Sequence, residues 1–287
     1  MRLATVVMGG ALYATITAAA ASAGTITITT DVSVAVKDRA LAITLKITNS
    51  GNEAAQTIAP EVRMGDHSVR APGAASLPPG PPLETTVEIP WDTTLAGQWP
   101  VVTAVDYADT NGYPFQALQV ALVTIGTASP SLVPVVDVTA SSVATAGTVR
   151  ARLKSLSEVP RQATIRFLVP RGLEVAEATR PLPMAPWSDA QVEARILNRS
   201  AMAGSRIPVF VTVEYDDAGG HHTSVAHDVA EIKTPESARG WYAFTLAALL
   251  TAAWVVVLAV RRWRAAPSPI TPAAEASHPP DTPPPAS

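Results

Sequence analysis

The 287-residue chain has no cysteine, and only 5% of its residues are aromatic and 16% are charged. The lack of cysteine excludes disulfides, thiolate metal sites and a cysteine nucleophile. A net charge of −3 gives no overall attraction to nucleic acid. Hydrophobic residues reach 47% and mean hydropathy is positive, which indicates large cores and membrane segments.

The motifs of common catalytic sites are also missing. The sequence contains no G-x-S-x-G, H-E-x-x-H, Walker or G-x-G-x-x-G pattern. His67 has Asp66 and Ser68 beside it, but adjacent residues do not form a catalytic triad. We therefore expect no enzyme activity, no catalytic residue, no cofactor and no metal; a hydrolase that uses surface carboxylates is the least favoured function.

The N-terminal segment has the pattern of a secretory signal. Residues 1–23 combine Arg2, an apolar stretch and the small-x-small sequence Ala21-Ser22-Ala23. We predict a signal peptide that is cleaved before Gly24, with an uncleaved anchor as the alternative.

The C-terminal segment predicts a membrane anchor. Residues 241–260 carry no charge, and at 1.5 Å per residue they span about 30 Å, the thickness of a hydrocarbon core. A basic cluster at Arg261, Arg262 and Arg264 then places the Pro-rich tail, 261–287, in the cytoplasm. The expected location is a cell membrane with one span and the N-terminal domains outside the cytoplasm, periplasmic or extracellular. A buried core helix is the alternative.

The region between these ends contains an internal sequence repeat. LAGQWPVVTAVDYADTNG (95–112) corresponds to MAGSRIPVFVTVEYDDAGG (202–220) at a shift of 107–108 residues. Gly97 matches Gly204 in this alignment. We predict two domains of one kind, at 24–127 and 130–236.

Both copies alternate with a period of two residues. Leu41, Ile43, Leu45 and Ile47 fall on one side, and turn signals such as PPGPP, TNG and AGG recur between such stretches. This pattern is typical of strands with one buried face. The predicted fold class is all-β: two tandem antiparallel sandwiches, with the signal peptide before them and the single transmembrane helix after them.

Three motifs of the first copy resemble bacterial CARDB-type and related Ig-like modules. They are NSGNEAAQTI, LPPGPPLETTVEIPW and LAGQWPVVTAVDYADTNG, and the likeness is looser in the second copy. The resemblance implies an Ig-like fold. Thr234-Pro235-Glu236 with the apolar span and the arginines is similar to a PEP-CTERM sorting signal, but 23 residues follow the arginines, so permanent anchoring is favoured.

The stretch VEYDDAGGHHT (213–223) is the densest group of titratable residues. Asp and Gly suit a tight hairpin turn, and the matching Asp106, Asp109 and Asn111 occupy the same place in the first copy. Calcium needs six to eight oxygen ligands, so we favour a turn over a metal site. We expect His221 and His222 to lie exposed at the start of a strand.

Two further groups are candidates for contact with a partner. Trp91, Trp99 and Trp187 could stack on sugars, although packing at a sandwich edge is favoured for Trp91 and Trp187. A basic stripe on one strand face is the predicted contact surface, with a solvated, charge-paired face as the alternative. Its members are Arg150, Arg152 and Lys154.

The function expected from these features is a non-catalytic scaffold or adhesion-type module of the cell envelope. It would bind a protein or a surface glycan, with no nucleic-acid partner. The alternative is an accessory subunit of a membrane-bound complex that makes or exports polysaccharide.

Overall fold

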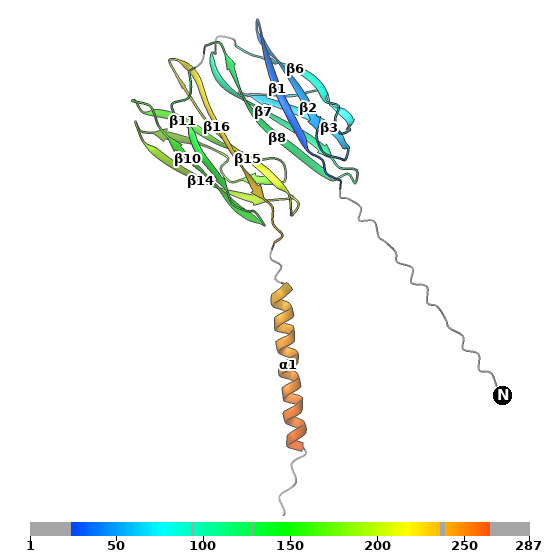
Figure 1. The fold of residues 1–287 in the computed structure, drawn as a ribbon. Helices are drawn as coiled ribbons and strands as arrows, with labels where there is room; N and C mark the ends of the chain where they lie inside the picture. Colours follow the sequence, from blue (N-terminus) through cyan, green and yellow to red (C-terminus); the bar gives the residue numbers. More distant parts are fainter. Residues whose placement is uncertain (1–23, 93–94, 128, 236–238, 265–287) are drawn as a thin grey trace, which may run out of the picture. The chain divides into compact units, whose positions relative to one another are not determined.

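The structure is a computed structural model that describes residues 24–92, 95–127, 129–235 and 239–264, without the side chains of 239–247 and 263–264. The predicted signal peptide and almost all of the predicted tail lie outside these residues. The described chain is all-β apart from one helix, as the sequence predicts (Figure 1).

The first half of the β region forms two sheets that enclose one core. Strands β1, β2 and β6 make one sheet, and β3, β4, β5, β7 and β8 lie in the other. The side chains of Leu41, Ile43, Leu45 and Ile47 are fully buried between them, which confirms the alternation read from the sequence. The strand bounds are β1 Ile28–Lys37, β2 Ala40–Asn49, β3 Ala55–Met64, β4 His67–Arg70, β5 Ala74–Leu77, β6 Leu83–Pro90, β7 Gly97–Ala108 and β8 Pro114–Ile125. We call this half the first sandwich.

The second half repeats this plan around its own core. Its sheets are β12-β14-β10-β9 and the run β13-β11-β15-β16. The strand bounds are β9 Val135–Ala140, β10 Ala146–Lys154, β11 Arg161–Leu168, β12 Leu173–Val175, β13 Thr179–Met184, β14 Asp189–Asn198, β15 Arg206–Asp217 and β16 Gly220–Glu231. We call it the second sandwich.

Strand pairing shows that the two halves are structural repeats. β2 pairs with β1 and β6, as β10 pairs with β9 and β14. Likewise β7 pairs with β3 and β8, as β15 pairs with β11 and β16. The repeated sequence therefore encodes one strand order twice.

The two sandwiches are nevertheless joined in one sheet. A parallel bridge between Gly97 of β7 and His221 of β16 connects the sheets of the two halves into a nine-stranded sheet. Both sandwiches belong to a single compact unit that ends at Pro235. This bridge places the hairpin singled out in the sequence at the boundary between the sandwiches.

The helix α1 (Arg239–Arg264) belongs to a separate unit. It contains the residues predicted to span a membrane. Among the residues that the structure describes, no helix meets the length and apolarity needed to cross a membrane. The transmembrane segment therefore stays a prediction.

Candidate binding site at the β15–β16 hairpin

The stretch VEYDDAGGHHT forms the turn between β15 and β16, as predicted. Positive φ values at Gly220 and the hydrogen bond from the Gly219 N–H to Asp217 Oδ1 (2.8 Å) shape the turn. Because side chains alternate across a strand, Glu214, Asp216 and His221 lie on one face and Tyr215, Asp217 and His222 on the other. The two faces have different neighbours.

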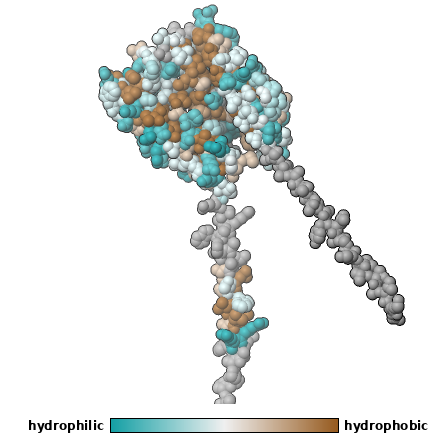
Figure 2. Space-filling model, viewed as in Figure 1, coloured by the Kyte–Doolittle hydropathy of each residue, from teal (hydrophilic) through white to brown (hydrophobic). Residues whose placement is uncertain are grey.

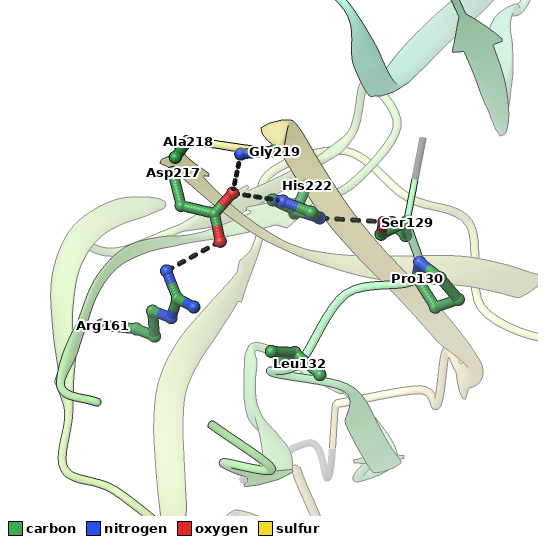
Figure 3. Close-up of a pocket in the computed structure, with 8 residues that line it drawn as sticks. All are labelled: Ser129, Pro130, Leu132, Arg161, Asp217, Ala218, Gly219 and His222. Carbon is green, nitrogen blue, oxygen red and sulfur yellow. Dashed lines mark hydrogen bonds and ion pairs between the residues drawn. The ribbon is translucent and has the colours of Figure 1, made fainter. Parts of the chain in front are cut away.

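On the inner face, Asp217 is shared between two basic side chains (Figure 3). Its Oδ2 lies 2.7 Å from Nη1 of Arg161 on β11, and its Oδ1 lies 2.8 Å from Nε2 of His222. Burial alone would raise the pKa of Asp217, but His222, the Gly219 amide and Arg161 outweigh burial and lower the pKa. Asp217 is therefore held as a carboxylate.

The same face reaches the connection between the sandwiches. His222 Nδ1 lies 3.2 Å from the Ser129 carbonyl oxygen, and its ring stacks on Tyr215 with centroids 4.8 Å apart. Arg161 lies over the Tyr215 ring, 5.4 Å from its centroid, and donates to Ser157 Oγ. A pocket of about 480 Å³ lies here (Figure 3). It is lined by Ser129, Pro130, Leu132, Arg161, Asp217, Ala218, Gly219 and His222.

On the outer face, His221 packs against the first sandwich. Its ring stacks on Trp99 of β7 with centroids 3.6 Å apart and planes 9° apart. Nδ1 lies 2.8 Å from Asp216 Oδ1, and Nε2 lies 3.5 Å from Glu214 Oε2, an ion-pair distance that is long for a hydrogen bond. Burial alone would lower the pKa of His221, but Glu214 and Asp216 outweigh it and raise the pKa above 6.5.

Glu214 is the buried acid of this contact, with a side chain only 10% exposed. It accepts a hydrogen bond from Thr212 Oγ1 (3.2 Å), and its Oε1 lies 3.7 Å from Nε of Arg166 on β11. Burial would raise its pKa, yet His221, Arg166 and Thr212 together lower it. Glu214 and Arg166 also line a groove of about 110 Å³ that includes Arg63 and Pro100 of the first sandwich.

Backbone contacts bring the sandwiches together at the same point. The His221 N–H donates to the Ala96 carbonyl (3.0 Å), and Thr223 Oγ1 donates to the Gln98 carbonyl (2.8 Å). Gly97 lies between these acceptors with φ +138°, and a Cβ there would overlap the His221 carbonyl and lie 2.5 Å from its nitrogen. Only glycine allows this approach.

Further along, the contact is apolar and then ionic. Ala104, Leu118 and Val120 of the first sandwich form a buried cluster with Phe210 of β15. Beyond it, Arg171 pairs with Asp106 at 3.2 Å. The hairpin is thus the polar part of a longer contact.

The prediction that His221 and His222 are exposed is wrong. They are 7% and 3% exposed, respectively. The physical reason is that His221 is covered by Trp99 of the first sandwich, while His222 lies between Tyr215 and the connecting segment. Tertiary contacts bury a strand start that would be exposed in an isolated sandwich.

The matching hairpin of the first sandwich uses its polar side chains differently. Asp109 Oδ1 accepts the N–H groups of Asn111 (2.9 Å) and Tyr113 (2.8 Å), which is a local turn contact. Asp106 instead faces outward, to Gln116 and Arg171. Asp109 and Asn111 thus bond to each other, whereas Asp106 contacts other parts of the chain.

The three tryptophans occupy different environments. Trp91 is 7% exposed and packs edge-to-face on Trp99, with centroids 4.8 Å apart. Trp187 is 63% exposed and has φ +51°, a backbone conformation that side chains disfavour. Packing at an edge, expected for both Trp91 and Trp187, holds for Trp91 but not for Trp187.

The basic residues Arg150, Arg152 and Lys154 of β10, the β10 stripe, lie on an exposed face and are paired with acids. Arg150 pairs with Glu193 at 3.0 Å, and Arg152 pairs with Asp137 at 3.3 Å. The register also sets Lys154 opposite Asp189. This geometry is the charge-paired alternative named from the sequence; the contact role of the stripe stays a prediction.

No family model and no curated protein matches the chain. Solved structures with some similarity include a mutant Salmonella alpha-2-macroglobulin (9% identity, TM-score 0.30), covering 71% of this chain and 16% of that one. Red sea bream transglutaminase has 14% identity and a TM-score of 0.23, and the match covers 71% of this chain and 31% of that one. E. coli alpha-2-macroglobulin has 9% identity and a TM-score of 0.30, and the match covers 73% of this chain and 17% of that one. The chain spans less than a third of each of these proteins, and likeness at this level carries no argument about function.

Proposed function

We propose that the protein is a non-catalytic, membrane-anchored module of the cell envelope, in which two tandem Ig-like sandwiches hold a protein or a surface glycan. The observation that carries the proposal is an exposed apolar end on the second sandwich. Its members are Leu132, Leu156, Val159 and Trp187, which are 38%, 39%, 52% and 63% exposed.

Backbone hydrogen bonds hold these residues on neighbouring loops. The Leu156 N–H donates to the Leu132 carbonyl (2.8 Å), and the Trp187 N–H donates to the Ser157 carbonyl (3.2 Å). Ser157 also accepts a hydrogen bond from Arg161, and Arg161 and Leu132 both line the hairpin pocket, so the apolar loops border this pocket and its charged groups. An exposed aromatic residue beside polar groups suits a sugar ring or a partner's apolar side chain.

The exposed loops lie at the end of the second sandwich where β16 begins, and this twelve-residue strand ends at Glu231. The described part of α1 carries exposed apolar residues, including Leu249 (67%) and Trp254 (66%), as a lipid-facing helix would (Figure 2).

A non-catalytic role is supported by what the titratable residues contact. Asp217, His222 and Arg161 pair with one another in the pocket, and Glu214 pairs with His221 and Arg166 at the boundary between the sandwiches. Their charges serve to hold the fold. An accessory role in polysaccharide synthesis or export would use the same Trp187 surface.

The test is binding of the full-length protein, in neutral detergent, to envelope polysaccharide and to cross-linked envelope partners. Trp187→Ala should weaken binding at least about tenfold, because an aromatic contact at a binding surface contributes over 1 kcal/mol. Tyr113→Ala is the control, since Tyr113 is an aromatic residue 59% exposed in the turn between β7 and β8 of the first sandwich, outside the proposed surface. Equal binding by both variants would contradict the proposed surface, and hydrolysis of the glycan would contradict the non-catalytic role.

A further inference from the structure

His221 occupies a position where its charge decides whether a buried contact is balanced. On β15, Glu214 and Asp216 face its ring; Arg166 of β11 reaches the same Glu214. The stacked Trp99 and the backbone of β7 supply no titratable group at this point. Arg63 of β3 lines the same groove as Glu214, but it pairs with Glu61 at 3.7 Å and so adds no net charge. Two carboxylates and the Arg166 guanidinium therefore leave a net charge of −1, which a protonated His221 cancels.

Both ring nitrogens of His221 face carboxylates. A neutral imidazole carries hydrogen on one nitrogen only, so it leaves the other nitrogen's lone pair toward a carboxylate oxygen. The imidazolium presents an N–H to each carboxylate, at hydrogen-bond distance to Asp216 and at ion-pair distance to Glu214. It is also attracted to the face of the Trp99 indole, against which it lies nearly parallel at 3.6 Å.

Loss of that proton would leave Glu214 poorly compensated. Asp216 is 79% exposed and remains solvated, but the Glu214 side chain is 10% exposed and would keep only Arg166 at 3.7 Å and the Thr212 hydroxyl. A buried charge that loses a partner destabilises its surroundings. The nearest way to rehydrate Glu214 is to separate the two sandwiches here.

We propose that His221 is a proton-dependent latch between the two sandwiches, closed while its ring is protonated and loosened when the proton leaves. The direction of its pKa agrees with this, because Glu214 and Asp216 raise it. A group with a raised pKa stabilises the closed form at low pH and loses that contribution as pH rises through the raised value. The inference concerns the ectodomain's response to pH and is independent of what the exposed loops bind.

The His221 amide reports directly on the latch, because it donates across the boundary to Ala96. We would measure its hydrogen exchange in the full-length protein in neutral detergent at about pH 6 and about pH 8, corrected for intrinsic exchange. The Ala71 amide, bonded to Pro60 within the first sandwich, is the internal reference. Protection at His221 should fall several-fold with rising pH while protection at Ala71 stays constant.

Three variants separate the latch from a general effect of pH. His221→Gln should abolish the pH-dependent part, and His227→Gln, at an exposed position on the same face of β16, should behave as wild type. Glu214→Gln keeps the histidine but removes the buried charge that its proton balances and that raises its pKa, so the transition should become smaller and move to lower pH. The proposal is wrong if wild-type protection is independent of pH, or if the transition is unchanged in Glu214→Gln or persists in His221→Gln.

Discussion

A methyl group added at Gly97 is the sharpest perturbation of the contact between the sandwiches. The Cβ of alanine would overlap the backbone of His221, which belongs to a rigid strand and cannot yield as a flexible side chain would. Gly204, its counterpart in the repeat, also has positive φ (+88°), but a Cβ there meets nothing within 4 Å. Gly204→Ala is therefore a matched control that carries the backbone strain without the clash.

The expected difference can be worked from the contacts that surround Gly97. Alanine at positive φ destabilises both variants by roughly 1–2 kcal/mol. Gly97→Ala must in addition separate His221 from Trp99, which loses a stacked pair of about 0.5–1.5 kcal/mol. It also loses the two hydrogen bonds to Ala96 and Gln98, about 0.5–1.5 kcal/mol each. The extra destabilisation of the closed form is therefore about 1.5–4.5 kcal/mol.

Calorimetry of the full-length protein measures this extra destabilisation. Wild type and Gly204→Ala should unfold the two sandwiches in one cooperative transition, because the sheets are continuous across the boundary. Gly97→Ala should split the transition in two, or lower one part while the other stays near wild type. If Gly97→Ala and Gly204→Ala give the same profile, the close approach at Gly97 contributes nothing and the reasoning is refuted.

Three further predictions concern stability and charge. Asn49→Ala should lower the free energy of unfolding by about 2–4 kcal/mol in denaturant titrations. The reason is that the Asn49 side-chain amide is fully buried and forms hydrogen bonds with the backbone of Thr27, Gly51, Glu53 and Leu77; an unchanged midpoint would contradict this. Thermal stability should be greatest between pH 4.5 and 6.5, the ordinary pKa values of Glu and His. The stabilisation from Glu214, whose pKa is lowered, is lost as pH falls below this window, and the stabilisation from His221, whose pKa is raised, is lost as pH rises above it. A monotonic pH profile would count against both. Serine at all three positions of the β10 stripe should change the melting temperature by a few degrees at most, because its pairs with Glu193 and Asp137 are exposed, and should reduce partner recovery at low salt only; equal recovery by wild type and variant would remove the stripe as a contact surface.

The strand core was predictable from the sequence because it obeys one rule, alternation against a single buried face. Leu41 to Ile47 on β2 follow this rule, whereas Val209 to Tyr215 on β15 are buried on both faces. The repeat at 107–108 residues also gave the strand order of the second sandwich once that of the first is known.

The buried outer face of the hairpin was not predictable in the same way. Glu214 and His221 are polar residues at outward positions, and a polar outward residue normally indicates contact with water. One signal pointed the other way: Val102, Ala104 and Val120 are apolar at outward positions of β7 and β8, as in a sheet covered on both faces. That signal identifies a covered face but not the strands that cover it.

The contact through the hairpin should hold the two sandwiches as one rigid unit, and the distance between the sandwiches tests this most directly. Because the chain has no cysteine, two introduced at the exposed positions Ser76 and Arg195 would carry spin labels, one on each sandwich. Pulsed electron spin resonance on the full-length protein at about pH 6 should give one narrow distance distribution, which broadens in Gly97→Ala and stays narrow in Gly204→Ala. A broad distribution in the otherwise wild-type protein would contradict the account.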